Sequence, residues 1–136
     1  MANKALVYAI YPDEKQNIQC QKTFGCCRFV YNHMLALQQD RYKNSEKHLN
    51  KKNANSYCNQ QFKEDYPFLR EVDKFALTNA IYHLEDGYDR FFKHLSKFPK
   101  FKSKHKAKKS YTTNFTNGNI EIGENFVKLP KLGVVK

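Results

Sequence analysis

The pattern of apolar and polar positions predicts a strand followed by a long helix at the start of the chain. Lys4–Tyr11 is rich in apolar and β-forming residues and is closed by Pro12, which is typical of a strand. Asp13 and Gln16 have the spacing of a capping box, a common start for a helix. Apolar residues then recur mostly every three or four positions over Glu14–Lys43, and this segment is predicted to be helical.

The middle of the chain is expected to hold two further helices. Gly25 is a candidate kink in the first helix or a break between two helices. The polar stretch Asn44–Asn55 reads as a loop or a frayed helix end. Tyr57–Tyr66 reads as a short helix that ends before a proline, since the residue before proline disfavours helical geometry. Asp73 is a good N-cap for a helix that keeps its apolar spacing as far as Ser96.

The last third of the chain has the pattern of short strands. Ser110–Thr116 is β-branched and aromatic, Asn117–Gly118 is a favoured hairpin turn, Ile120–Ile122 alternates, and Phe126–Leu129 follows another turn. Two or three antiparallel strands are therefore expected, and the lone opening strand most naturally pairs with them. The predicted fold class is α+β, a small sheet or partial barrel that carries an inserted helical bundle.

Composition allows a real core but leaves a strong excess of positive charge. The chain has 136 residues, of which 40% are hydrophobic and 15% aromatic, and its formal net charge is +11. One ordinary domain fits this length. The part from Met1 to Asp89 is close to neutral, with 12 basic and 11 acidic residues, whereas Arg90–Lys136 has 12 basic and 2 acidic residues. Nearly all the excess charge therefore lies in the last third.

A lysine strip interrupted by aromatic residues carries this charge, and no carboxylate occurs between Arg90 and Ile120. Neutralised phosphates release counterions and aromatic faces stack on unpaired bases, so nucleic acid is the natural partner. A solvated basic tail is the plain alternative. The lysines of the strip that are candidate nucleic-acid contacts are Lys97, Lys100, Lys102, Lys104, Lys106, Lys108 and Lys109.

The residues show little sign of catalysis or of a cofactor. The acids Glu85, Asp86 and Asp89 interleave with apolar positions of the last predicted helix, so they are expected on its wet face rather than around metal ions. The chain contains no His-x-His pair, no phosphate-binding P-loop and no Gly-x-Gly-x-x-Gly motif. No cofactor and no metal are expected.

The cysteines and the lack of long apolar runs indicate the cellular compartment of the protein. No segment approaches the ~20 apolar residues of a membrane helix, and the start of the chain does not read as a signal peptide. A cytoplasmic protein without a membrane partner is expected. Its cysteines should then be reduced core thiols; they are Cys20, Cys26, Cys27 and Cys58.

Three motifs in order resemble those of the TnpB proteins, a transposon family related to the compact type V CRISPR nucleases. They are K-T-F-G-C-C-R-F-V-Y-N-H at Lys22–His33, F-P-K-F-K-S at Phe98–Ser103 and L-P-K-L-G-V-V-K at Leu129–Lys136. The resemblance extends to Ala5–Pro12 and Val72–Phe92, so it covers essentially the whole chain.

Members of this family are RNA-guided DNA endonucleases, and the resemblance implies their domain plan. Residues 1–12 and 110–136 would form a wedge domain, an incomplete antiparallel barrel of the oligonucleotide-binding type. Residues 13–109 would form the inserted helical recognition domain with its basic linker. The metal site of the family lies in a RuvC-like nuclease domain that this sequence does not reach, so the chain is expected to be non-catalytic.

The resemblance also implies which residues contact nucleic acid. Contacts to the motif beside the DNA target are expected from Asn3, Lys74, Phe75, Thr78 and Thr116. Lysine can donate to a base edge or a phosphate, phenylalanine can pack on a base, and short polar side chains can hydrogen-bond in a groove. Phe75 could equally be a core residue and Lys74 a solvated one.

Arg28 lies in the first motif and could either cover the helix or reach a phosphate. The lysine strip is expected to contact the backbone of guide RNA or duplex DNA. Self-association through an unpaired edge of the incomplete barrel is a further expectation.

Two other functions stay open on the sequence alone. One is a stand-alone regulator that binds DNA without a guide, as a repressor of transposition or transcription. The other is an enzyme that cuts or joins DNA through its helix acids or a tyrosine.

Overall fold

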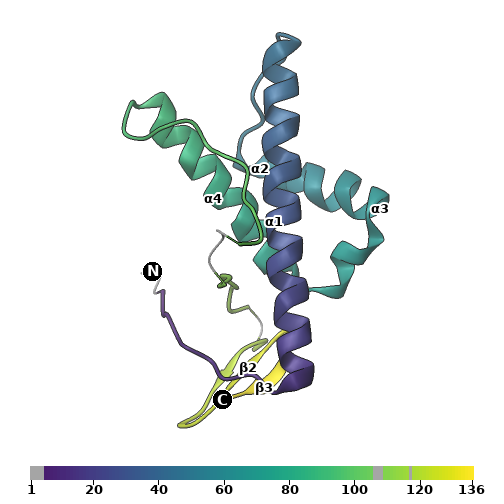
Figure 1. The fold of residues 1–136 in the computed structure, drawn as a ribbon, viewed down its shortest axis with the longest axis vertical. Helices are drawn as coiled ribbons and strands as arrows, with labels where there is room; N and C mark the ends of the chain where they lie inside the picture. Colours follow the sequence, from purple (N-terminus) through teal and green to yellow (C-terminus); the bar gives the residue numbers. More distant parts are fainter. Residues whose placement is uncertain (1–4, 106–108, 117) are drawn as a thin grey trace.

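The computed structural model describes residues 5–105, 109–116 and 118–136 and has the expected α+β class. Figure 1 shows α1 as the long axis, with α4 on one side of it, α2 close beside it, α3 on the other side, and a small sheet at the N-terminal end of α1. The helical elements are α1 (Glu14–Lys43), α2 (Lys51–Tyr57), the π-helix η1 (Cys58–Phe62), α3 (Lys63–Asp65), the 3-10 helix η2 (Pro67–Glu71) and α4 (Lys74–Phe92).

Helix α1 begins at the predicted capping box. The Gln16 amide donates to Asp13 Oδ1 over 2.8 Å, and the Asp13 amide donates to Gln16 Oε1 over 3.0 Å. These bonds satisfy two backbone donors that the first turn of a helix leaves free. The helix then continues without a break to Lys43, so the predicted alternative of a break between two helices at Gly25 is wrong. One interior glycine costs about 1 kcal/mol, which the packing of a 30-residue helix can override.

The second helical stretch begins earlier than predicted and ends where predicted. Asn50 caps α2 by accepting a hydrogen bond from the Asn53 amide over 2.8 Å, so only the first half of the polar stretch 44–55 is a loop. An asparagine cap explains why polar residues open this helix. The stretch ends at Asp65, directly before Tyr66 and its following proline.

Helix α4 ends at Phe92 rather than at Ser96. His94 adopts a left-handed conformation with φ +60°, and the Leu95 amide turns back to donate to the carbonyl of Arg90 over 2.8 Å. This bond is the mark of a Schellman motif, which stops a helix and satisfies its last carbonyls. Glycine usually occupies the left-handed position, and its absence explains why the end was predicted too late.

The core of the protein is the contact between α1 and α4, closed by the segment between them. Large aliphatic side chains of both helices are almost fully buried. Each stabilises the fold by about 1.5–3 kcal/mol relative to an exposed position. The most buried are Val30, Met34 and Leu35 on α1 and Leu77, Ile81 and Leu84 on α4, with Leu69 of η2 beside them.

Glu85 lies inside this core, against the prediction of a wet face. Its side chain is buried, with Gln38 Nε2 donating to Oε1 over 3.0 Å and His48 Nε2 lying 2.7 Å from Oε2. Glu85 is four residues after Ile81 and therefore shares its helix face. The other two acids follow the prediction better: Asp86 is half-buried and paired with Lys51, and Asp89 is exposed.

A three-stranded antiparallel sheet forms the second part of the fold, with strand order β1-β2-β3. Its strands are β1 (Glu121–Ile122), β2 (Val127–Leu129) and β3 (Gly133–Val135). The register pairs Ile122 with Val127 and Val127 with Val135. The predicted turn before β2 is confirmed, since the Gly123 amide donates to the carbonyl of Phe126 over 2.9 Å. Among the described residues the sheet is not closed, and the partial barrel with its inserted helical bundle stays a prediction.

Two predicted strands are absent from the described residues, and one strand was missed. Residues 5–11 and 110–116 are not strands, whereas β3 had not been predicted. The opening segment meets the end of the chain after β3, where the Tyr11 amide donates to the carbonyl of Lys136 over 2.6 Å. Val7 is 98% exposed. A segment of strand-forming residues does not become a strand unless another strand pairs with it. The division into residues 1–12 and 110–136 against 13–109 stays a prediction.

All four cysteines are free thiols, as expected, and burial suppresses their ionisation. Desolvation raises the pKa of Cys58 to about 11 and that of Cys27 to about 12. Within the described part of the chain, no helix is long and apolar enough to cross a membrane.

Iodoacetamide at pH 8 is therefore expected to alkylate Cys27 and Cys58 far more slowly in the folded protein than in urea, because the thiolate is the reactive form. Mass spectrometry of tryptic peptides measures both rates. Because the folded state raises both pKa values, the free energy of unfolding is expected to fall as pH rises above about 9, where unfolded thiols ionise. Equal alkylation rates in the two states would contradict this packing.

Candidate nucleic-acid interface

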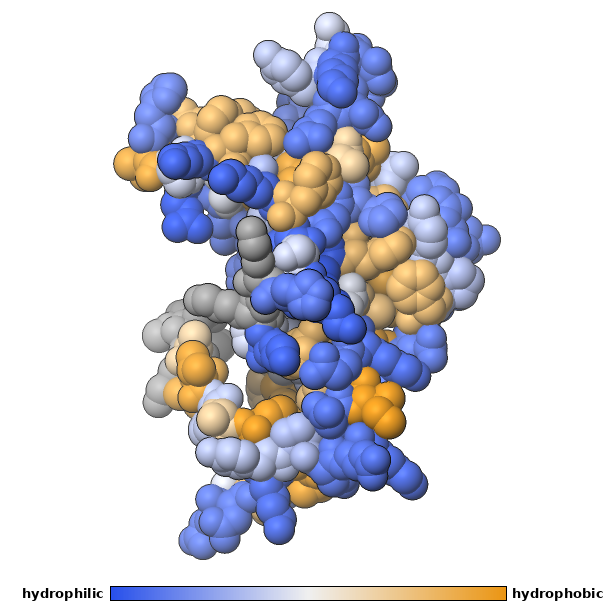
Figure 2. Space-filling model, viewed as in Figure 1, coloured by the Kyte–Doolittle hydropathy of each residue, from blue (hydrophilic) through white to orange (hydrophobic). Residues whose placement is uncertain are grey.

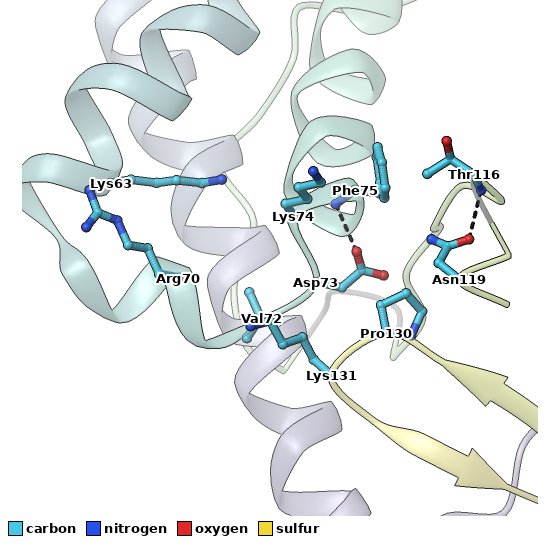
Figure 3. Close-up of a pocket in the computed structure, with 10 residues that line it drawn as sticks. All are labelled: Lys63, Arg70, Val72, Asp73, Lys74, Phe75, Thr116, Asn119, Pro130 and Lys131. Atoms are coloured by element: carbon cyan, nitrogen blue, oxygen red, sulfur yellow. Dashed lines mark hydrogen bonds between the residues drawn. The ribbon is translucent and has the colours of Figure 1, made fainter.

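The start of α4, the helical stretch before it (α3 and η2), and a loop and a turn of the sheet region surround a pocket of about 400 Å³. Asp73 caps the helix by accepting a hydrogen bond from the Phe75 amide over 2.9 Å. Lys74 and Phe75 therefore lie in the first turn, facing this space. Figure 3 shows the side chains that line the pocket, which are Lys63, Arg70, Val72, Asp73, Lys74, Phe75, Thr116, Asn119, Pro130 and Lys131.

Asparagine side chains position the wall opposite α4. The Thr116 amide donates to Asn119 Oδ1 over 2.8 Å, and Asn119 Nδ2 donates to the carbonyl of Asn114 over 2.9 Å. Asn79 on α4 reaches across and donates to the carbonyl of Thr112 over 3.1 Å. Local side-chain bonds of this kind hold turns, so the loop is fixed against the helix without being a strand.

The pocket carries more positive than negative charge. Lys63, Arg70, Lys74 and Lys131 line it together with one carboxylate, Asp73. Desolvation lowers the pKa of Lys63, and the charges of Lys74 and Arg70 lower it further. A phosphate near these groups would relieve their repulsion. The pocket is therefore suited to an anionic strand on its rim.

The structure brings together three of the residues predicted for the DNA motif and separates a fourth. Lys74, Phe75 and Thr116 line the same pocket. Thr78 lies one turn further along α4, where its hydroxyl donates to Asn55 Oδ1 over 3.0 Å, and it does not line the pocket. Asn3 lies outside the described residues.

The lysine strip crosses α1 after leaving the end of α4. Lys102 is held there by two bonds to Asn32: its amide donates to Oδ1 over 2.8 Å, and Nδ2 donates to its carbonyl over 2.9 Å. Its ammonium lies 4.3 Å from the centre of the Tyr31 ring, a cation–π distance. Lys97, Lys100, Lys104 and Lys109 are exposed, whereas Lys106 and Lys108 lie outside the described residues.

Arg28 is half-buried on α1, on the stretch that carries Tyr31 and Asn32. The positive charges of Arg28 and Lys102 both lower the pKa of the Cys27 thiol, against the larger rise caused by burial. Arg28 and Lys102 of the strip therefore both lie near the Cys27 stretch of α1. Its two predicted roles, covering the helix and reaching a phosphate, both stay open.

Aromatic side chains gather where α4 ends, beside the strip. Phe98 meets Phe91 edge to face at 5.1 Å and Tyr88 at 5.5 Å between ring centres. Phe92 and Phe101 are exposed. Figure 2 shows the resulting hydrophobic patch over the outer end of α4. Exposed rings next to lysines match the composition of single-strand binding surfaces.

Several pocket residues were not predicted from the sequence. Lys63 and Arg70 come from segments that the resemblance did not single out, and Asn119 follows a turn that drew attention only for its geometry. Lys131 lies in the third motif, which was a signal that could have found it. In the described ranges, no group of three or more His, Cys, Asp or Glu residues could hold a metal ion.

A family model for a helix-turn-helix domain of the OrfB proteins of IS605 elements matches residues 1–47. These residues contain α1, and the turn after α1 leads into α2. Over 127 residues the chain is 31% identical to a Streptomyces pristinaespiralis protein named "Putative RNA-guided DNA endonuclease", which covers 89% of this chain. The chain belongs to the TnpB family.

Other relatives of the chain differ in how much of their length it covers. The Escherichia coli K12 protein named "Putative RNA-guided DNA endonuclease InsQ" is 25% identical over 132 residues. The chain spans about a third of the length of both endonuclease relatives, 32% in each case. Virulence protein VsdF of Salmonella dublin is 28% identical over 112 residues, and 94% of VsdF is covered.

The contact between Asn32 and the lysine strip makes a prediction about local stability. Asn32→Ala removes two hydrogen bonds to the backbone of Lys102, worth about 1–2 kcal/mol together. Trypsin is expected to cleave after Lys100–Lys104 about 5- to 30-fold faster, because the segment opens more often. The exposed Asn59→Ala is the control. Unchanged cleavage in Asn32→Ala would show that the strip is held by other contacts.

Proposed function

We propose that this chain is the nucleic-acid-binding part of a TnpB-type RNA-guided DNA endonuclease. The lysine strip and the exposed rings beside it would bind guide RNA, and the pocket at the start of α4 would contact the duplex motif beside the DNA target. The observation that carries the proposal is the meeting of Lys74, Phe75 and Thr116 in one cationic pocket. Strand cleavage would belong to the part of the endonuclease relatives that this chain does not span.

The charge distribution supports a strand that runs across the molecule. Lys97, Lys100 and Lys104 are exposed, and the segment that carries them is pinned to α1 through Lys102. A pinned strip presents its charges at fixed spacing, so less side-chain and backbone entropy is lost when phosphates bind. The exposed rings of Phe92 and Phe101 offer stacking surfaces for unpaired bases, at about 1–3 kcal/mol each.

The test uses the chain as purified from its host, with any RNA that accompanies it identified by sequencing. Binding of this RNA is measured by fluorescence anisotropy between 50 and 300 mM KCl. If about six phosphates are contacted, log K is expected to change with log salt with a slope of roughly −4 to −5. The double variant Lys100→Gln/Lys104→Gln should make the slope shallower by about 1.5.

Matched variants separate the two surfaces. Lys15→Gln/Lys43→Gln changes the net charge equally at exposed positions outside the strip and should leave the slope unchanged. Lys74→Gln should weaken duplex binding but not RNA binding. A flat salt response, or equal effects of the two double variants, would overturn the proposal.

A second candidate function is a stand-alone DNA-binding regulator, favoured by VsdF, in which the matching segment makes up 94% of the protein. The same duplex assay, done after RNase treatment, distinguishes the two. Binding of a defined duplex by RNA-free protein favours the regulator, and loss of duplex binding with the RNA favours the guided protein.

Self-association is proposed through β1, which has one partner strand in the described sheet. An unpaired edge strand can pair with another chain. Light scattering is expected to show an apparent mass that rises with concentration. Ile122, 53% exposed on β1, offers the test: Ile122→Lys should lower the association, because an edge lysine blocks pairing. A constant monomer mass would contradict it.

A further inference from the structure

We propose that Asp73 is a specificity-determining residue, whose free carboxylate oxygen accepts a hydrogen bond from the amino group of a cytosine. The inference rests on the proposed function, because it assigns a base to the pocket that would contact the duplex motif. It concerns the choice of base rather than the strength of binding.

The starting observation is a buried oxygen with nothing to bond. Asp73 is 1% exposed, and its Oδ1 accepts from the Phe75 amide over 2.9 Å. Its Oδ2 has no hydrogen-bond partner among the described residues, and less than 1 Å² of it is exposed. A buried polar atom without a partner costs about 1–3 kcal/mol. Helix capping needs only Oδ1, so it does not explain the second oxygen.

The position of this oxygen connects it to the pocket. Thr113 Oγ1 is the other buried side-chain oxygen without a partner in the described part, and Thr113 does not line the pocket, whereas Asp73 does. Figure 3 shows the free oxygen of Asp73 pointing toward the side where Asn119 and Pro130 lie. The lining also includes long, flexible side chains, such as Lys63, Arg70 and Lys131. These can move aside to admit a base edge.

The chemistry of a carboxylate selects among the bases. In the major groove only cytosine N4 and adenine N6 are amino donors, whereas thymine O4 and guanine O6 and N7 are acceptors and repel a carboxylate. Adenine places its N7 acceptor next to N6, so a carboxylate close to N6 also meets repulsion from N7. Cytosine has no such neighbour on this edge. The Asp73 oxygen therefore favours cytosine over the other three bases.

The surrounding charges suit such a contact. Lys74 is the exposed first residue of α4, and Phe75 beside it is half-buried, so phosphate and base can be met from one turn of helix. The carboxylate lies at the N-terminal end of the helix dipole, with these cations lining the same pocket. Cations attract any sequence, whereas the carboxylate rejects the wrong base. In this pocket, one set of groups thus contributes to binding strength and another to base specificity.

The test is a selection from 30-bp duplexes with six randomised base pairs, done with the protein as purified with its RNA and again after RNase treatment. Bound duplexes are sequenced. The unaltered chain should enrich cytosine at one position by about 5- to 100-fold over the other bases, the range for one good base contact.

Two substitutions at Asp73 keep the helix cap and remove the acceptor. Asp73→Asn should turn the preference away from cytosine toward guanine or thymine, because the amide nitrogen is a donor. Asp73→Ser caps the helix with its hydroxyl and should lose the preference altogether. Asp13→Asn is the matched control, since Asp13 caps α1 in the same way outside the pocket. Thermal melting verifies that each variant is folded.

The outcomes separate the two levels of the proposal. Salt-dependent duplex binding without a base preference, or a cytosine preference that survives in Asp73→Asn and Asp73→Ser, would overturn the role of Asp73 and leave the proposed function standing. Failure of the unaltered chain to bind any duplex, with or without RNA, would overturn both.

Discussion

The packing of α1 against α4 is the contact on which the rest of the molecule depends. Met34 and Leu35 meet the side of α4 that carries Ile81 and Leu84, and all four are buried to within about 1% of their surface. This contact fixes the direction of α4 and therefore the place of its first turn. The pocket lies at that first turn, and the lysine strip begins after the last turn of the same helix. The positions of both candidate surfaces thus depend on this one apolar contact between α1 and α4, which we call the seam.

A polar cluster inside the seam fixes how α1 and α4 are aligned. Glu85 receives hydrogen bonds from α1 through Gln38 and faces His48 from the loop after α1. Apolar contacts tolerate sliding by a fraction of a turn, whereas a buried carboxylate loses its partners when it slides. The cluster therefore favours one register of α1 against α4. A helix acid thus serves the fold rather than a reaction.

Local signals were predictable from the sequence, and signals that depend on distant partners were not. The caps at Asp13 and Asp73 involve neighbours within three residues, and the apolar spacing of both long helices is equally local. The end of α4 was missed because His94 takes a conformation that usually marks glycine. Glu85 was misplaced because its burial depends on Gln38 and His48, which are 47 and 37 residues away.

The sheet region shows the same limit more strongly. Residues 110–116 have the composition of a strand, yet asparagine side chains hold the neighbourhood of Asn114 instead of a partner strand. For the pocket, the resemblance indicated Lys74, Phe75 and Thr116, because those residues lie in matched segments. Lys63 and Arg70 belong to a separate helical stretch, and no pattern in the sequence predicts that they lie beside the start of α4.

The attachment of the sheet to the start of α1 has a mechanical consequence. There the Tyr11 amide donates to the carbonyl of Lys136 and the Gln16 side chain donates to the carbonyl of Val134. The buried sheet valines Val127 and Val135 are not part of the helical core cluster. Pro130 and Lys131 lie in the turn between β2 and β3, and Asp73 is the N-cap of α4. The width of the pocket between Asp73 and the Pro130–Lys131 turn therefore depends on how the sheet is attached at the start of α1.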